Sequence, residues 1–279
     1  MAGFELKEGL YEDREVSEDE MWSSIACVFT SESKNDASYK FGFLKAILDN
    51  FDKVNKDYVL TFDQLFSRFA ELYWSLILEH NISQKAATRH KRKSAIERVL
   101  LEAKDKYLVD DFVEFDNLPA KARTDVIHKV KMECKKYVVG ALFETTRHLF
   151  YSFSKKDEWI KLNPRMYSFI SKRKEEVDKL NCYEWAHFLS KVNPMYSTGE
   201  ILNRFLLKSR KSKVNTTELL IEAETLISNP AEQKNKNDGA VIKKEIRESI
   251  VNVEIDEEAM ALLDDPISLI KLLKKRRGI

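Results

Sequence analysis

The sequence predicts a mainly α fold: a multi-helix globular domain with one small β-hairpin and a short charged C-terminal segment. Among 279 residues there are only 7 glycines and 5 prolines, which favours long helices over turn-rich β structure. In several stretches apolar residues recur at three- and four-residue spacing, as on a helix with one buried face. Hydrophobic residues make up 43% of the chain, so a large core can form without disulfides or a structural metal.

The first twenty residues form an acidic segment. Lys7 and Arg14 are its only basic residues, set against a run of glutamates and aspartates. Such a composition buries little apolar surface, so we expect residues 1–20 to be a flexible arm. The helical domain is expected to follow over residues 21–228.

The domain is predicted to begin with well-marked helices. Ser38 is placed to cap a mostly buried helix over residues 39–48. Thr61, with Gln64 three residues later, has the spacing of a capping box. The apolar positions beyond it recur at helical spacing and predict a second helix to about His80.

Two more helices and a hairpin are expected next. The third helix follows a basic stretch and begins near Ser94, and Pro119 occupies the first turn of the fourth. The pattern then changes to short aromatic runs on either side of the polar residues 154–158. That arrangement predicts a β-hairpin near residues 149–162.

The part of the chain after the hairpin is predicted to be helical as far as a linker. An Asn-Pro pair after the hairpin is typical of a helix start, Asn181 is placed to cap the following helix, and Pro194 ends it. Residues 229–239 have the composition of a linker. Residues 240–279 are then expected to form a C-terminal segment that ends in a basic helix.

The sequence offers few candidates for catalysis or metal binding. The three cysteines are widely spaced, which suits buried thiols in a reducing compartment, and no cysteine or histidine pair has zinc-ligand spacing. Glycine loops for phosphates and a serine nucleophile elbow are also missing. We therefore expect no metal, no cofactor and no enzymatic activity. The histidines interpreted as structural are His80, His90, His128, His148 and His187.

Two short motifs could still be read as parts of a metal-dependent nuclease. Glu102 and Glu133 each begin a Glu-x-Lys triplet. Because 33% of the residues are charged, such triplets arise by chance, and both fall in predicted helices rather than in the strand that this kind of site normally uses. We interpret them as ordinary helix residues.

Positive charge gathers near residues 85–93, 208–213 and 271–277. Such clusters can neutralise nucleic-acid phosphates, or they can form a solvated face or a dock for an acidic partner; the second reading is favoured and the first stays open. The acidic arm of the chain itself could be that partner. The candidate binding residues are Lys85, Arg89, Lys91, Arg92, Lys93, Lys208, Arg210, Lys211, Lys274, Lys275, Arg276 and Arg277.

Three stretches together resemble the helical region that precedes the nuclease module in a group of bacterial HNH-endonuclease proteins. They run from Ser38-Tyr39-Lys40-Phe41 to Asp49, from Phe69 to Tyr73-Trp74 with Gln84 beyond it, and from Tyr183-Glu184-Trp185 to Asn193. In that group a module with zinc-knuckle cysteines and a metal-binding histidine pair follows. Here residues 195–279 contain neither cysteine nor histidine, so the resemblance implies a scaffold without the nuclease.

The resemblance also implies a biological setting. Such proteins are similar to components of restriction and anti-phage defence loci. The resemblance is compatible with a Lamassu-like system, which has an SMC-like ATPase and a nuclease effector. We expect a non-catalytic accessory subunit that scaffolds such partners, with a DNA-binding protein or divergent nuclease as the alternative. No stretch approaches the roughly 18 apolar residues of a membrane span, and no secretory signal is visible, so we expect a cytoplasmic location.

Overall fold

Helix α2 (Tyr39–Asp49) lies at the centre of the fold, between α3 (Phe62–Trp74) and α7 (Lys174–Val192). All residues from Phe41 to Leu48 are buried, so this helix is covered on every side rather than along one stripe. Phenylalanine rings of α2 and α3 pack against each other in a tilted arrangement, with the Phe43 and Phe66 centroids 5.6 Å apart. The predicted helix over residues 39–48 is therefore confirmed as the buried core element.

The computed structural model describes residues 5–30, 33, 36–85, 93–107 and 112–203. Over these residues the fold is mainly helical with a small antiparallel sheet, which confirms the predicted fold class. The chain divides into two compact units, residues 1–193 and residues 194–279. The predicted linker at 229–239 and the basic C-terminal helix lie outside the described residues.

Local capping signals define α3 as the sequence predicts. The Thr61 side chain accepts from the backbone N–H of Gln64, and the Gln64 side chain accepts in return from the Thr61 N–H at 2.8 Å. The helix continues into a π-helical turn over Ser75–Glu79. The N–H of His80 donates to the carbonyl of Ser75 at 3.1 Å, which ends the helical stretch where expected.

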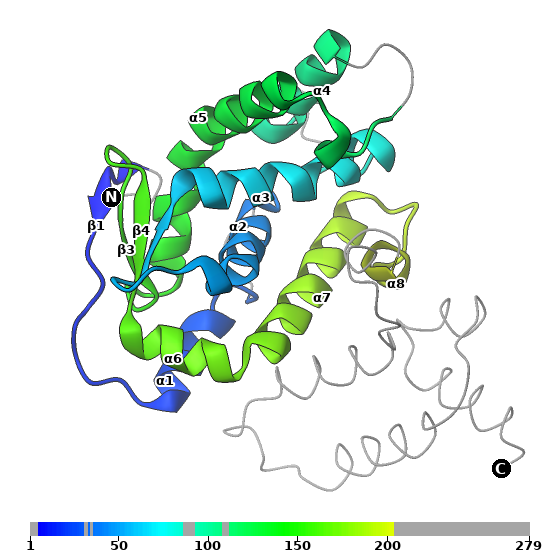
Figure 1. The fold of residues 1–279 in the computed structure, drawn as a ribbon. Helices are drawn as coiled ribbons and strands as arrows, with labels where there is room; N and C mark the ends of the chain where they lie inside the picture. The colour runs from blue at the N-terminus through cyan, green and yellow to red at the C-terminus, as the bar shows by residue number, and fades with distance from the viewer. Residues whose placement is uncertain (1–4, 31–32, 34–35, 86–92, 108–111, 204–279) are drawn as a thin grey trace, which may run out of the picture. The chain divides into compact units, whose positions relative to one another are not determined.

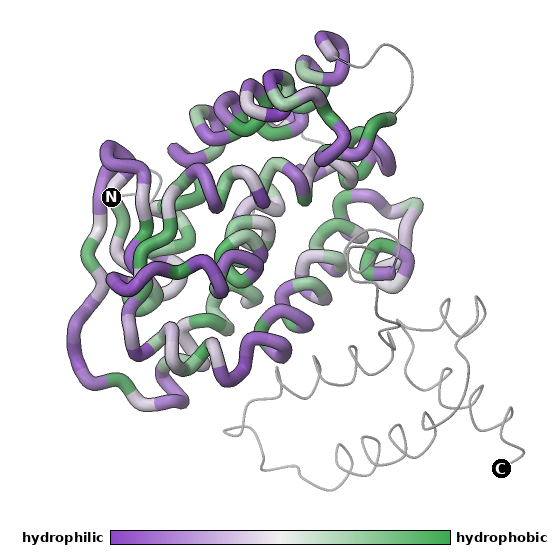
Figure 2. The backbone as a smooth tube through the Cα atoms, in the orientation of Figure 1, coloured by the Kyte–Doolittle hydropathy of each residue, from purple (hydrophilic) through white to green (hydrophobic). Residues whose placement is uncertain are grey.

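Helices α4 (Ala95–Tyr107) and α5 (Ala120–Thr145) pack side by side, and α5 also packs on α3 (Figure 1). Hydrophobic and hydrophilic residues alternate along both helices, as Figure 2 shows, so that each has one face in the core. Pro119 caps α5 from the position just before its first turn. A short 3-10 turn at Phe115–Asn117 precedes α5, and another at Phe51–Lys53 follows α2.

The predicted hairpin is confirmed and belongs to a larger sheet. Strands β3 (Tyr151–Ser154) and β4 (Trp159–Leu162) pair in antiparallel register, with Ser154 opposite Trp159. Two further strands, β1 (Glu8–Gly9) and β2 (Val59–Thr61), give the order β1-β3-β4-β2. The sequence did not reveal these strands, because two or three residues are too few to show an alternating pattern.

The acidic arm expected to be flexible is instead attached to this sheet over its described part. Lys155 donates its N–H to the Lys7 carbonyl at 2.8 Å, and Glu12 donates to the His148 carbonyl at 2.9 Å. A side chain at Gly9 would place its Cβ 2.8 Å from the rings of Phe143 and Phe153, so only glycine permits this close approach. Backbone pairing, which composition does not report, orders the segment.

The arm leads directly into α1 (Glu18–Ala26). The Ser17 hydroxyl accepts from the Glu20 N–H at 3.2 Å and caps this helix. Arg14 pairs with Glu12 at 2.9 Å and with Glu20, both within the same segment. These two carboxylates are thus paired within the arm, and whether the arm also contacts the basic stretch falls on residues 86–92, which lie outside the described residues.

One predicted helix boundary is wrong. Asn181 does not cap a new helix, because α7 runs without interruption through it, after α6 (Pro164–Lys172). The Asn181 side chain is fully buried and donates to the Phe41 carbonyl of α2 at 3.0 Å. In the second unit, α8 (Thr198–Ile201) begins with a capping box formed by Ser197 and Glu200.

A buried group of charges links the central helices. The ammonium of Lys45 on α2 lies 3.1 Å from Asp178 on α7 and 2.5 Å from Asp49, and only 5% of the Lys45 side chain is exposed. Arg68 on α3 pairs with the other Asp49 oxygen at 2.8 Å. Burial opposes ionisation of Asp49, but the Lys45 and Arg68 charges outweigh it and hold its pKa below the usual value.

We predict that Asp178→Ala destabilises the protein by about 3–5 kcal/mol, because it leaves the Lys45 ammonium buried beside one carboxylate fewer. Urea denaturation followed by circular dichroism measures the change. Glu175→Ala, which removes an exposed carboxylate 3.5 Å from Lys179 on the same helix, is the control and should cost less than about 1 kcal/mol. Equal losses in the two variants would contradict the prediction.

Candidate functional site

The stretches that carry the HNH-type resemblance meet at one buried polar junction, made of Ser38, Tyr73, Ser83, Gln84 and Asn193. The Ser38 hydroxyl donates to the Gln84 side-chain oxygen at 2.7 Å, and the Tyr73 hydroxyl donates to the Ser38 carbonyl at 2.9 Å. Tyr73 is fully buried, which raises the pKa of its phenol well above the usual value. Because Ser38 is engaged in this way, its side chain does not cap α2.

The third stretch joins the junction through the end of α7. The Asn193 side chain accepts from the Ser83 N–H at 2.8 Å and donates to the Ser83 carbonyl at 2.9 Å. The rings of Trp185 and Tyr73 pack with their centroids 5.4 Å apart. These motif residues are therefore used inside the protein, where they connect α2, α3 and α7.

Residues 37–39, at the start of α2, contact the chain on both sides of the basic segment 85–93. At one end the Ser38 N–H donates to the Gln84 carbonyl at 3.1 Å, and Lys85 forms a β-bridge with Ala37. At the other end the N–H of Ile96 donates to the Tyr39 hydroxyl at 3.1 Å. The start of α2 thus holds the described residues on either side of positions 86–92.

Only two of the predicted binding residues fall within the described part of the chain. Lys85 is half-buried and Lys93 is exposed just before α4. Both lie at the ends of the basic segment, next to the anchoring bonds. The others lie outside the described residues: Arg89, Lys91, Arg92, Lys208, Arg210, Lys211, Lys274, Lys275, Arg276 and Arg277.

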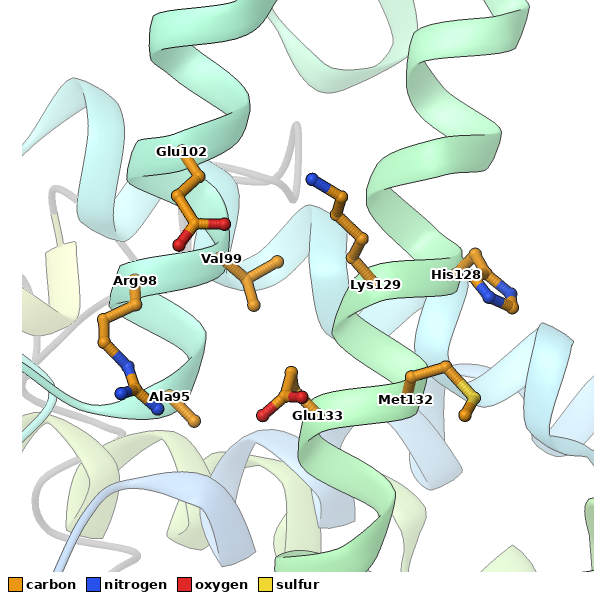
Figure 3. Close-up of a pocket in the computed structure, with 8 residues that line it drawn as sticks. All are labelled: Ala95, Arg98, Val99, Glu102, His128, Lys129, Met132 and Glu133. Atoms are coloured by element: carbon orange, nitrogen blue, oxygen red, sulfur yellow. The ribbon is translucent and has the colours of Figure 1, made fainter.

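A groove of about 490 Å³ lies between α4 and α5 (Figure 3). Its walls carry charged side chains of both signs around a small apolar surface. It is lined by Ala95, Arg98, Val99 and Glu102 of α4 and by His128, Lys129, Met132 and Glu133 of α5. This groove could not be predicted from the sequence, because its two walls come from separate helices whose relative rotation is set by core packing.

The groove is lined by the glutamates of both Glu-x-Lys triplets, Glu102 and Glu133. In a helix, residues two apart point to different faces, whereas in a strand they share one. Accordingly Lys135 points away from the groove that Glu133 lines and binds Glu158 in the hairpin turn at 2.6 Å. Over the described residues, no three His, Cys, Asp or Glu side chains are grouped so that they could hold a metal ion.

Two histidines have carboxylate neighbours that sequence reasoning missed. His80 lies 3.1 Å from Glu79, and the Ser75 hydroxyl donates to the same Glu79 oxygen at 2.6 Å. In a hydrolytic triad the histidine lies between the serine and the carboxylate and takes the serine proton. Here the carboxylate of Glu79 lies between Ser75 and His80, so this arrangement does not place the histidine to take the serine proton. His148 pairs with Glu144 at 3.3 Å and stacks on Phe143.

Comparison with known proteins finds no matching family model, no similar curated protein and no similar solved structure. No helix over the described ranges is both long and apolar enough to cross a bilayer. Function must therefore be argued from the surfaces and buried contacts of this chain.

We predict that Tyr73→Phe lowers the free energy of unfolding by about 1–2 kcal/mol, because it removes the hydroxyl that bonds Ser38 in the buried junction. Tyr137→Phe is the matched control, since Tyr137 is 41% exposed, and it should leave stability unchanged. Thermal and urea denaturation of both variants measure the difference. A Tyr73→Phe variant as stable as the wild type would show that the junction is not needed for the fold.

Proposed function

We propose that this chain is a non-catalytic accessory subunit that docks an effector or ATPase subunit in a bacterial anti-phage defence complex. The observation that supports docking is the acidic arm, which is attached to the sheet and to α1 while its carboxylates face outward. The defence setting rests on the HNH-type resemblance of the three stretches that form the buried junction. In this proposal the junction maintains the scaffold and the arm contacts the partner.

The arm presents a surface suited to a basic partner. Leu10, 80% exposed, lies among the carboxylates, and Arg14 is engaged by Glu12 and Glu20 of the same segment. An ordered segment avoids the entropy loss of folding on binding, so its contacts can contribute fully to affinity. Glu12 pairs with Arg14, and Glu18 pairs with Arg173 at 2.7 Å. The exposed carboxylates outside these ion pairs are Glu5, Glu8, Asp13, Glu15 and Asp19.

The order of the arm changes how docking should be tested. Deleting residues 1–20 would remove strand β1 and the first turn of α1, so lost binding could reflect a damaged fold. Neutral substitutions of exposed carboxylates keep the backbone contacts. They therefore separate the docking surface from the stability of the protein.

We predict that replacing Glu8, Asp13, Glu15 and Asp19 together by their amides weakens capture of partner subunits at least about tenfold, because charge complementarity is lost. Affinity purification of the tagged full chain from its native operon, after nuclease treatment, with quantitative mass spectrometry, measures capture. Unchanged capture with an unchanged melting temperature would refute docking through the arm. The matched control carries the same change at exposed Asp57, Asp105, Glu114 and Asp116.

A second candidate function, nucleic-acid binding, is favoured by the anchoring of the basic segment 85–93 at both ends. A segment held at two fixed points presents its charges from a defined place on the fold. Phosphate binding by Lys85, Arg89, Lys91, Arg92 and Lys93 would use that placement. The divergent-nuclease version is disfavoured by the separation of Glu133 from Lys135.

If the chain binds nucleic acid, replacing Arg89, Lys91, Arg92 and Lys93 by alanine should reduce DNA affinity about 100-fold or more at low salt. The slope of log affinity against log salt should also become shallower, since fewer counterions are released. Gel shifts over a salt series measure both. Wild-type protein that gives no salt-dependent shift would exclude this function. Mg²⁺-dependent cleavage that is abolished by Glu102→Gln or Glu133→Gln would instead support the divergent-nuclease alternative.

A further inference from the structure

The charges on the walls of the α4–α5 groove form an alternating square. Figure 3 shows Glu102 of α4 and Lys129 of α5 toward one end of the groove, and Arg98 of α4 and Glu133 of α5 toward the other. Each wall therefore carries one positive and one negative charge, and the order of signs is opposite on the two walls. The four formal charges sum to zero.

Ion pairs within the described part of the fold leave these four charged side chains able to bind a partner. Among the ion pairs of the described residues, none joins Arg98 to Glu133 or Glu102 to Lys129 across the groove. Glu133 binds Lys136 at 2.9 Å, but both side chains are at least 40% exposed, and such a pair is weak and easily exchanged. All four charged groups remain able to bind a partner.

An apolar contact lies within the same surface. Met132, 46% exposed, is one of the few large hydrophobic side chains exposed over the described residues, and Ala95 and Val99 lie on the facing wall. Methionine is flexible and suits a contact that must adapt to another surface. Covering it would contribute favourable burial that the isolated chain does not have.

We propose that this groove binds a second copy of the same chain, in a two-fold symmetric dimer. Consider a second copy related by a two-fold axis that lies in the plane of this surface, either along the groove or across it. In both cases every positive side chain of the square in one copy faces a negative side chain of the square in the other. An isologous interface requires such self-complementarity, and it closes at two subunits. The inference does not depend on the role proposed for the acidic arm.

The same pattern argues against partners of uniform charge. A nucleic acid or a polybasic peptide laid along the groove meets as many like charges as opposite ones, so the surface gives it no net attraction. A second copy meets only opposite charges. The formal net charge of +1 for the whole chain also gives little repulsion between copies.

The test uses two variants of the full chain with reversed charges. The acidic variant carries Arg98→Glu and Lys129→Glu, so that all four corners are negative, and the basic variant carries Glu102→Lys and Glu133→Lys, so that all four are positive. All four charged groups lie on the protein surface, so both variants should retain the wild-type circular dichroism and melting temperature. A matched control carries Lys53→Glu and Lys56→Glu, exposed positions outside the groove.

Sedimentation velocity over a concentration series measures association. We expect the wild type and the control to dimerise, and each groove variant alone to associate at least about 100-fold more weakly, because like charges face one another. An equimolar mixture of the acidic and basic variants should restore the dimer. Recovery by mixing is specific to a contact of this groove with itself, since a merely misfolded variant would not regain it.

Three results would overturn the proposal. Wild-type protein that is monomeric at about 100 µM would exclude a dimer of useful affinity. Groove variants that dimerise as well as the control would place the contact elsewhere on the chain. Folded variants that stay monomeric when mixed would show that the groove does not meet a second copy of itself.

Discussion

The burial of α2 is the constraint on which the rest of the structure depends. A central helix covered on all sides brings its polar groups into the interior, where each must find a partner in the protein. Lys45 finds Asp49 and Asp178, the Phe41 carbonyl accepts from Asn181, and Ser38 binds Tyr73 and Gln84. These bonds determine how α3 and α7 lie against α2, and they position the loop that leads to α4.

This arrangement explains why motif residues that look functional in the sequence are structural in the fold. Serine, tyrosine, glutamine and asparagine side chains at the junction are directed inward, and their polar atoms are engaged by one another or by backbone. They contribute to function by positioning other residues, because they hold Ser83 and Gln84, just before the basic segment. The surfaces that we propose bind partners are elsewhere, on the acidic arm and in the groove between α4 and α5.

In these proposals the acidic arm and the groove recognise their partners through different patterns of charge. The arm is mostly acidic, so it favours a partner with a basic surface and would increase the rate of association with it. The groove carries both signs in alternation around an apolar contact, so it selects a matching pattern at close range. A subunit that both self-associates and docks another protein would need two surfaces that differ in this way.

The sequence by itself determined the features that depend on neighbouring residues. The Thr61 capping box, the 39–48 helix and the hairpin near residues 149–162 were predicted because their signals lie within a few residues of the element they define. The role of Asn181 depends on tertiary contacts, because its partner Phe41 lies 140 positions away. The order of the arm does so too, because its two-residue strand pairs with Ser154 and Phe153. The groove likewise depends on how α4 and α5 are rotated in the packed core. A polar side chain that can cap, bind or be buried is ambiguous until its distant neighbours are in place, because the free energy of each choice depends on those neighbours.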